Sequence, residues 1–160
     1  MFTDEQFTRC VQENMNTVFR VAFSYMKSRT DADDITQNVF LKLFKENKDF
    51  DDDAHVRHWL IRVAINECKK TLLHPWRRSE PLEDYAATLT FSTPEHSELF
   101  YAVMNLPKKY RVAVFLYYYE DYTTDEISQL LGIPSATVRT HLKRGREHLK
   151  ITVMEANGHV

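Results

Sequence analysis

Glycine is scarce in this sequence, and that scarcity constrains the fold more than any other feature. Only Gly132, Gly145 and Gly158 occur among the 160 residues, whereas average usage would give about eleven glycines in a chain of this length. Sheets with many tight turns and loops that wrap phosphate groups both consume glycine. The scarcity therefore predicts an all-α protein without a Gly-rich phosphate-binding loop.

Apolar residues recur at helical spacing through the first half of the chain. A first helix has a stripe made of Phe7, Val11, Met15, Val18, Ala22 and Tyr25. After a break over Ser28 to Asp34, a second helix directs inward Ile35, Val39, Leu43 and Phe44. A third helix, from about residue 54 to 73, has on one side Val56, Leu60, Val63, Ala64 and Glu67. Residues 1–74 are therefore predicted to form a small bundle of three or four helices.

The helical pattern stops between Pro75 and Pro94. Three prolines interrupt any helix there, and Ser, Thr and acidic residues fill the space between them. We interpret residues 75–94 as a flexible linker to a second domain at residues 95–155, which is predicted to contain four helices.

The second domain has the spacing of a helix-turn-helix. Thr123 and Glu126 are placed as a capping box that starts a helix, and Gly132 ends it in the left-handed conformation that such a turn needs. After a three-residue turn, the next helix begins near Ser135.

The second helix of this motif carries a basic outer face. Its members are Arg139, Thr140, Lys143, Arg144, Arg146 and Lys150. Arginine suits guanine edges in the major groove, and either basic residue suits phosphate. A solvated basic helix without function is the alternative, but the preceding turn favours DNA recognition.

A second basic cluster closes the first domain, where aromatic residues alternate with basic ones. It comprises Trp59, Arg62, Lys69, Lys70, His74, Trp76, Arg77 and Arg78. Such a mixture fits contact with single-stranded or distorted DNA, because bases stack on aromatic rings. Trp59 is nevertheless predicted to be a core anchor beside Leu60, and the role of Trp76 stays open.

Several classes of function are disfavoured by the sequence. The net charge of −2 argues against a strongly basic, independent nucleic-acid binder, although local basic patches suit a protein that reads DNA within a larger assembly. No apolar run approaches the length of a membrane span, and no secretory signal opens the chain, which predicts a cytoplasmic protein without membrane insertion. We find no catalytic residues, because no activated nucleophile or triad is present.

Metal and disulfide chemistry are not expected either. Cys10 and Cys68 are predicted to be buried free thiols. His55 and His58 lie three residues apart but lack a third ligand. The acids at positions 31, 33 and 34 are interpreted as stabilising a helix start rather than binding calcium. No cofactor is predicted.

Two motifs together resemble one family. Residues 30–44, TDADDITQNVFLKLF, resemble the region 2 helix of bacterial RNA polymerase sigma factors, and residues 58–66, HWLIRVAIN, are similar to its Trp-Leu-x-x-Ile-Ala-x-Asn segment. Leu106-Pro107 through Tyr110-Arg111, and then residues 124–150 with their Leu-Gly-Ile-Pro core, resemble region 4. The pairing of these two regions alone resembles the extracytoplasmic-function, or group 4, sigma factors.

The resemblance implies a monomeric protein that binds the β′ and β subunits of core RNA polymerase, directs it to promoter DNA and helps to open it. Residues implied to face the polymerase are Asp34, Gln37, Asn38 and Leu41. For the −10 element, met by residues 50–66 and the basic end of the third helix, the candidates are His55, Arg57, Arg62, Asn66, Lys69 and Lys70. For the −35 element they are Thr137, Arg139, Thr140, Lys143, Arg144 and Arg146. An anti-sigma partner is a further expectation.

The sequence departs from the family pattern in two places. The loop before the third helix is acidic, Asp51-Asp52-Asp53, where the family often has Arg, Gly and polar residues. Gly145 stands where the family commonly has Ala, at a helix cost of about 1 kcal/mol.

Two alternatives to a sigma factor stay open at this point. One is an independent helix-turn-helix regulator that dimerises through its N-terminal helices and reads a palindrome. The other is a sigma-like adaptor that binds polymerase without reading promoters.

Overall fold

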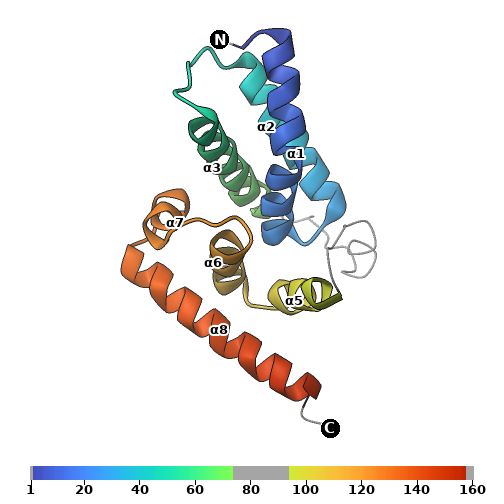
Figure 1. Cartoon of the computed structure of the whole chain (residues 1–160), viewed down its shortest axis with the longest axis vertical. Helices are drawn as coiled ribbons and strands as arrows, with labels where there is room; N and C mark the ends of the chain where they lie inside the picture. Colours follow the sequence, from blue (N-terminus) through green and yellow to red (C-terminus); the bar gives the residue numbers. More distant parts are fainter. Residues whose placement is uncertain (1, 74–93, 158–160) are drawn as a thin grey trace. The chain divides into compact units, whose positions relative to one another are not determined.

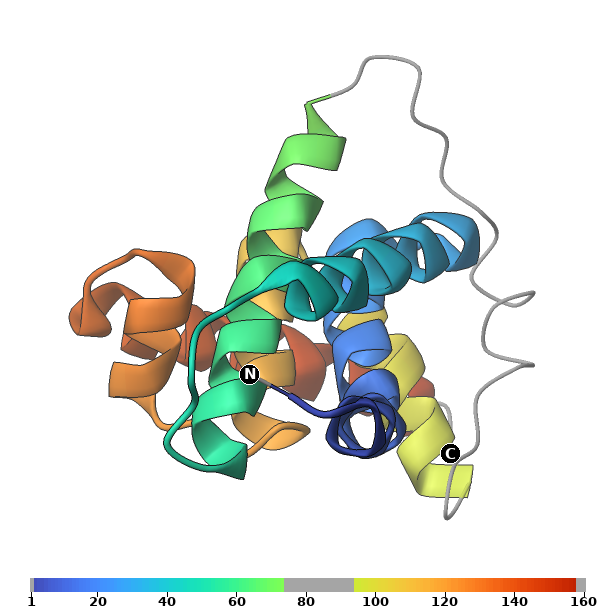
Figure 2. The ribbon, with the colours of Figure 1, turned by 90° about the horizontal axis from the view of Figure 1, so that it is seen from above.

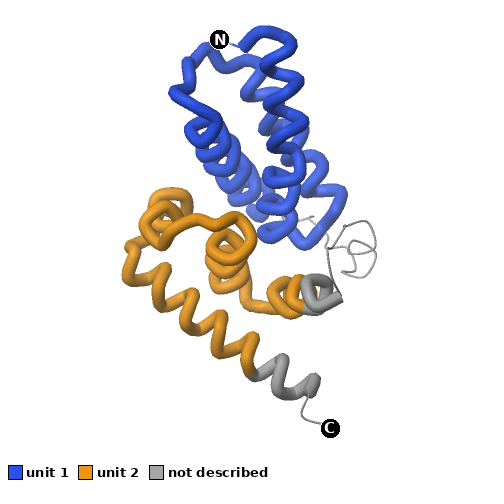
Figure 3. The backbone as a smooth tube through the Cα atoms, viewed as in Figure 1, with its two compact units in different colours: residues 1–81 blue, residues 82–160 orange. Residues whose placement is uncertain are grey.

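In the computed structural model, the backbone is described for residues 2–73 and 94–157, and side chains are described for residues 2–73 and 99–150. Every regular element in these ranges is an α-helix (Figure 1), which confirms the all-α prediction. The chain divides into unit 1, residues 1–81, and unit 2, residues 82–160 (Figure 3). The predicted linker lies outside the described residues, except for Pro94, which begins the first helix of unit 2.

Unit 1 is built from α1 (Asp4–Met26), α2 (Arg29–Lys45) and α3 (Asp53–Leu72). Each of the three packs against the other two, and a view from above shows α2 and α3 crossing (Figure 2). The predicted bounds of the third helix, 54 to 73, agree with those of α3 within one residue at each end.

The connection between α1 and α2 is much shorter than the predicted break from Ser28 to Asp34. Lys27 caps the end of α1 in the left-handed conformation, with φ of 53°, and the Ser28 side chain accepts a hydrogen bond from the Asp31 backbone N–H to start α2. The prediction was wrong because the hydroxyl of Ser28 caps the new helix at once. The aspartates at 31, 33 and 34 then lie inside α2.

The start of α3 is fixed by the acidic loop. The Asp52 carboxylate accepts a hydrogen bond from the His55 backbone N–H at 2.8 Å, and the Asp51 backbone N–H donates to Nδ1 of His55 at 3.0 Å. Asp52 is therefore the N-cap of α3 and Asp53 its first residue. The departure from the family pattern at this loop has a structural role as a helix cap.

The core of unit 1 contains most of the predicted apolar residues. Its buried members include Val18, Ala22, Phe23, Met26, Ile35, Val39, Leu43, Val56, Leu60, Ala64 and Ile65. Cys10 and Cys68 are buried free thiols, which confirms that prediction, and burial raises the pKa of the Cys10 thiol.

Three further expectations for unit 1, all on side-chain burial, were wrong. Met15 is 45% exposed because Asn14 takes the inward position, where its amide donates to the Cys10 carbonyl at 2.9 Å. Phe44 is 63% exposed, because Leu43 turns inward at that level of α2. Trp59 is only half-buried and packs its ring on Phe50, with 5.8 Å between ring centroids, while Leu60 occupies the core.

Unit 2 contains α5 (Pro94–Met104), α6 (Lys108–Tyr118), α7 (Thr124–Leu131) and α8 (Ser135–Asn157). Helix α6 packs against each of the other three, and residues 110 to 116 of α6 are all buried. One of them is Arg111, whose guanidinium donates to the Leu106 carbonyl at 3.3 Å. Tyr117, expected on the inward stripe, is 38% exposed.

The helix-turn-helix geometry is as predicted. Thr123 and Glu126 form the capping box at the start of α7, and Gly132 ends α7 with φ of 69°. Helix α8 begins at Ser135.

Gly145 has a role that its helix propensity does not indicate. A Cβ at this position would lie 2.5 Å from Cγ2 of Val114, a buried residue of α6. The absence of a side chain lets α8 approach α6 closely, so Gly145 serves packing between the two helices.

Candidate nucleic-acid interface

The basic face of α8 is presented to solvent as the sequence predicted. Arg139, Thr140, Lys143, Arg144 and Arg146 are all exposed, and Thr137 is half-buried. The Thr140 hydroxyl donates to the Ala136 carbonyl at 3.1 Å, which fixes its rotamer on the helix surface. The structure therefore places all six −35 candidates on one helix.

The turn between α7 and α8 is fastened by two serine hydroxyls. Ser128 donates to the Ile133 carbonyl at 2.5 Å, and Ser135 donates to the Asp125 carboxylate at 2.8 Å. The Ser128 bond thus ties the turn to α7, and the Ser135 bond ties the start of α8 to α7, so the basic face is firmly supported.

Sequence reasoning missed that tyrosines of α6 contact α8. The Tyr110 ring lies against His141 and His148, with centroid separations of 5.5 and 5.6 Å. The Arg144 guanidinium beside the hydroxyl lowers the pKa of Tyr110. Desolvation lowers the pKa of His141 as well, so that ring is neutral at pH 7.

A second tyrosine lies farther along α6. The Arg146 guanidinium donates to the Tyr118 hydroxyl at 3.2 Å. Because α6 and α8 are distant in sequence, only the aromatic content of α6 could have suggested these contacts.

The basic face of α3 is also exposed. Arg57, Arg62, Asn66, Lys69 and Lys70 are accessible to solvent, while His55 is half-buried with its Nδ1 occupied by the Asp51 N–H. His74, Trp76, Arg77 and Arg78 lie outside the described residues.

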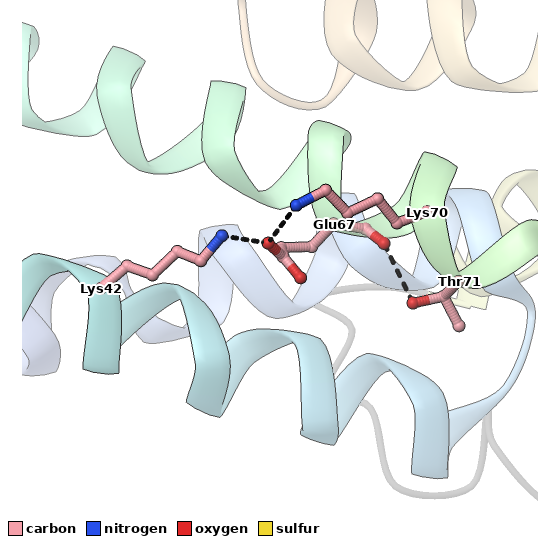
Figure 4. Close-up of polar contacts among 4 residues, drawn as sticks. All are labelled: Lys42, Glu67, Lys70 and Thr71. Carbon is pink, nitrogen blue, oxygen red and sulfur yellow. Dashed lines mark hydrogen bonds and ion pairs between the residues drawn. The ribbon is translucent and has the colours of Figure 1, made fainter.

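Glu67 joins the basic face of α3 to α2. Its carboxylate pairs with Lys42 of α2 and with Lys70, whose Nζ lies 3.7 Å away (Figure 4). Its backbone carbonyl accepts a hydrogen bond from the Thr71 hydroxyl at 3.0 Å. The Lys42 ammonium holds the pKa of Glu67 below its usual value, so this carboxylate is charged at neutral pH.

The predicted polymerase face of α2 is accessible along its whole length. Asp34, Gln37, Asn38 and Leu41 are all exposed, and Leu41 is 54% exposed. Phe44 lies three residues beyond Leu41 and continues the same stripe. Its ring meets Phe7 of α1 edge-on, with centroids 5.4 Å apart, so the stripe ends in an aromatic pair that the sequence analysis placed inside the core.

A cleft of about 450 Å³ lies between the start of α1 and the residues that lead into α3. Its lining combines the basic Arg9 and Lys48, the acidic Asp52 and the aromatic Phe50. Phe50 is itself surrounded by rings, with His55 at 5.1 Å and Trp59 at 5.8 Å between centroids. The acidic loop therefore borders a hollow on unit 1 in addition to capping α3.

No cluster of three or more metal-ligating side chains occurs within the described ranges. Over the same residues, no helix combines the length and apolarity needed to cross a membrane.

Comparisons with known proteins agree with these features. The family model for sigma-70 region 2 matches residues 10–78, and that for sigma-70 region 4 matches residues 96–149. RNA polymerase sigma factor SigV of Bacillus subtilis is 27% identical over 149 residues, covering 89% of this chain and 87% of that protein. The ECF RNA polymerase sigma-E factor of Haemophilus influenzae is 28% identical over 162 residues, covering 90% and 85%.

Solved structures show the same fold. The sigma factor RpoE, in complex with the anti-sigma factor NepR from Bartonella quintana, has a TM-score of 0.72 and 15% identity, covering 92% of this chain and 96% of that one. CnrH, in complex with the cytosolic domain of CnrY, has a TM-score of 0.67 and 24% identity, covering 94% and 89%. The two family matches occur in the expected order and together span most of the sequence, and both solved structures share the fold over most of the chain. The chain belongs to the sigma-70 family of RNA polymerase sigma factors and is of the extracytoplasmic-function type.

Proposed function

We propose that the two units of this sigma factor divide its work. Unit 1 holds the polymerase through α2 and meets the −10 element through α3, while unit 2 reads the −35 element through α8. The observation that carries the proposal is the basic outer face of α8, where five residues are exposed. The start of this helix and the turn before it are each tied to α7 by a serine hydrogen bond. A rigid helix with Arg and Lys on its outer face suits insertion into the major groove.

The face of α2 suits protein rather than DNA. Leu41 and Phe44 are more than half exposed, and Asp34, Gln37 and Asn38 extend the stripe with polar groups. An exposed apolar patch with a polar border is typical of a protein interaction site. We assign this face to the β′ subunit of core polymerase, with Phe44 as a contact that sequence analysis missed, and we expect unit 2 to approach the β subunit.

The face of α3 suits the separated strands of the −10 element. Arg57, Arg62, Asn66, Lys69 and Lys70 offer basic and amide groups to phosphates and bases. The half-buried Trp59 and the neighbouring His55 add ring surfaces at the start of the helix. Promoter opening needs such contacts, because unpaired bases stack on rings while phosphates meet cations.

Control by an anti-sigma protein accords with the same surfaces. The sigma factor RpoE, which shares this fold, has been solved with the anti-sigma factor NepR bound, and CnrH has been solved in complex with the cytosolic domain of CnrY. Here the apolar face of α2 would otherwise stay exposed in the absence of polymerase. We propose that this chain is a cytoplasmic monomer outside those complexes.

Run-off transcription with purified core polymerase and a library of genomic promoters tests the function. We expect initiation from a small set of promoters that depends on this chain. Failure to direct initiation from any promoter would contradict the proposal. Dimerisation with tight binding to palindromic duplex in the absence of polymerase would instead support an independent regulator.

The polymerase face is tested by substitution. We expect Asn38→Ala and Leu41→Ala to weaken binding to core polymerase, while unit 2 keeps its binding to −35 DNA. Met15→Ala is a matched control, because Met15 is also an exposed apolar residue of unit 1, on α1. Pull-down with core polymerase that is unchanged for both α2 variants would contradict the assignment.

A further inference from the structure

Helix α6 presents one stripe of residues to three successive residues of α8. Tyr110, Val114 and Tyr118 are spaced four residues apart, so they lie along one side of α6. Tyr110 lies beside Arg144, Val114 lies against Gly145, and Tyr118 bonds Arg146. The two helices therefore meet with Gly145 at their contact and a tyrosine on each side of it.

Residues two apart on an α-helix point to nearly opposite sides, because each residue turns by about 100°. Arg144 and Arg146 thus emerge from opposite flanks of α8. Arg146 donates a hydrogen bond to the Tyr118 hydroxyl, and Arg144 lies beside the Tyr110 hydroxyl. The outer face between these flanks carries Thr140 and Lys143, both exposed. The basic face therefore has Arg144 and Arg146 at its edges, each beside a tyrosine of α6, while Thr140 at its centre bonds within α8, to the Ala136 carbonyl.

The restraint on Tyr110 is the more extensive of the two. Its ring is buried and held between His141 and His148, while Lys109 lies over the ring with Nζ 5.2 Å from the centroid. The ring cannot swing away without breaking these contacts, so the hydroxyl keeps its place beside the Arg144 and Lys109 cations, which together lower its pKa. Tyr118 is 48% exposed and packs edge-on against Tyr117, with 4.9 Å between centroids.

We propose that Tyr110 and Tyr118 are positioning residues, which hold the guanidinium groups of Arg144 and Arg146 at the two edges of the DNA-reading face. A long flexible side chain loses rotamer freedom when it binds, and part of that loss has then occurred before DNA arrives. A neutral hydroxyl achieves this without cancelling the positive charge that phosphate and guanine require. The inference rests on the proposed reading of −35 DNA by α8.

The test uses the full chain with core polymerase and a promoter obtained from the transcription library. Tyr110→Phe and Tyr118→Phe keep the rings and remove only the hydroxyls. We expect each to lower promoter binding by about threefold to tenfold, the range of one lost hydrogen bond. Tyr117→Phe is the matched control, since it removes a hydroxyl next to Tyr118 at the same end of α6. This variant should bind the promoter as the unsubstituted chain does.

Two further measurements separate positioning from a merely structural role. In an Arg144→Ala background, Tyr110→Phe should have no additional effect, because the group on which it acts is gone. The slope of log binding constant against log salt should be unchanged by Tyr110→Phe but should fall by about one for Arg144→Ala if that guanidinium meets phosphate. Additive losses from Tyr110→Phe and Arg144→Ala would overturn the inference.

The contact itself is checked without DNA. In chains carrying ¹³C-labelled tyrosine, the Tyr110 signal, assigned by its loss in Tyr110→Phe, should titrate at higher pH after Arg144→Ala, because the cation that lowers its pKa most is removed while Lys109 remains. An unchanged titration would contradict the contact.

The failures of the two proposals differ. If Arg144→Ala weakens binding to the promoter but both Phe variants bind normally, the positioning role of the tyrosines is wrong, while the proposal that α8 reads DNA stands. If Arg144→Ala and Arg146→Ala leave binding to every promoter unchanged, both proposals fall.

Discussion

In unit 1 a basic side chain of α3 is held by a carboxylate, since Glu67 pairs with both Lys42 and Lys70, whereas in unit 2 the edge arginines of α8 meet the hydroxyls of Tyr110 and Tyr118. A carboxylate cancels charge and competes with phosphate for its lysines. A phenol orients a guanidinium and leaves its charge intact. Glu147, exposed on α8, is the acidic group that acts on Arg144 at longer range.

The difference indicates different tasks for the two basic faces. Glu67 links α3 to α2, so the face proposed for the −10 element is coupled to the face proposed for polymerase. The tyrosines link α8 only to α6 of the same unit. The ion pairs of Glu67 thus join the two proposed binding faces of unit 1, whereas the tyrosines of unit 2 support one proposed reading face.

The largest expected effect is a loss of stability in unit 2, caused by disrupting the contact between α6 and α8. Gly145→Val should destabilise this unit by about 3 kcal/mol, because overpacking a tight helix contact forces α8 away from α6. The Cβ alone would stand 2.5 Å from Val114, whose branched side chain is stiff and buried. Thermal unfolding of the full chain measures the change.

Leu43→Ala serves as the counterpart in unit 1. Leu43 is 1% exposed, and its truncation should cost about 3 kcal/mol in that unit. If Gly145→Val left the unfolding of unit 2 unaltered, the close contact of α6 and α8 would not be the support we describe.

The next largest effect is expected on promoter binding, when the Arg144 guanidinium proposed to contact the −35 element is removed. Arg144→Ala should weaken binding to cognate promoters by about 1–3 kcal/mol and relax the base preference at one or two upstream positions. Binding to a panel of promoters with single-base changes measures this. A uniform loss on all sequences would instead show that Arg144 contacts phosphate.

The two residues that end helices in the left-handed conformation allow a matched pair of substitutions, which should change stability in opposite directions. Unit 1 has Lys27 at φ 53° and unit 2 has Gly132 at φ 69°. Lys27→Gly should stabilise unit 1 and Gly132→Ala should destabilise unit 2, each by about 1 kcal/mol, since a Cβ is disfavoured at positive φ. Gly132→Asn should lose less, because Asn tolerates this conformation. Chemical denaturation measures all three, and equal stabilities for Gly132→Ala and the parent would refute the strain argument.

The smallest effect concerns the carboxylate of unit 1. Glu67→Gln should cost unit 1 about 0.5–1 kcal/mol at pH 7, because its ion pairs lie at the surface. The folded pKa of Glu67 is lowered, so its stabilisation is fully present above the ordinary carboxyl pKa of about 4.3 and is lost as pH falls through the lower folded value. The difference between the stabilities of parent and variant, measured by unfolding from pH 7 to pH 3, should shrink as the pH falls below the ordinary carboxyl pKa. A constant difference over that range would exclude the ion pairs as its source.

Helical periodicity predicted the elements well but not every inward side chain. Ile35, Val39 and Leu43 are buried as expected, whereas Phe44 is exposed although it lies one position from Leu43. Both positions border the apolar stripe, and only the packing of α1 and α3 decides between them. Asn14 shows the reverse, since a local hydrogen bond to Cys10 lets a polar residue be buried where Met15 was predicted.

The site was predictable at the level of faces. The exposed residues of α8, α3 and α2 are those that the motifs indicated, and their roles stay predictions. The contacts of Tyr110 and Tyr118 were not predictable, because they depend on the crossing of α6 and α8 at Gly145. Sequence alone indicates that Gly145 weakens a helix, and only its neighbour Val114 reveals the reason for it.

The two-residue connection at Lys27 and Ser28 bears on the order in which the molecule folds. Closing so short a segment costs little chain entropy, and contacts between α1 and α2 are local in sequence. We expect this helical hairpin to form early, with α3 docking on it afterwards. Because the same segment is synthesised before unit 2, the apolar face of α2 should be able to bind a partner before the basic face of α8 has formed.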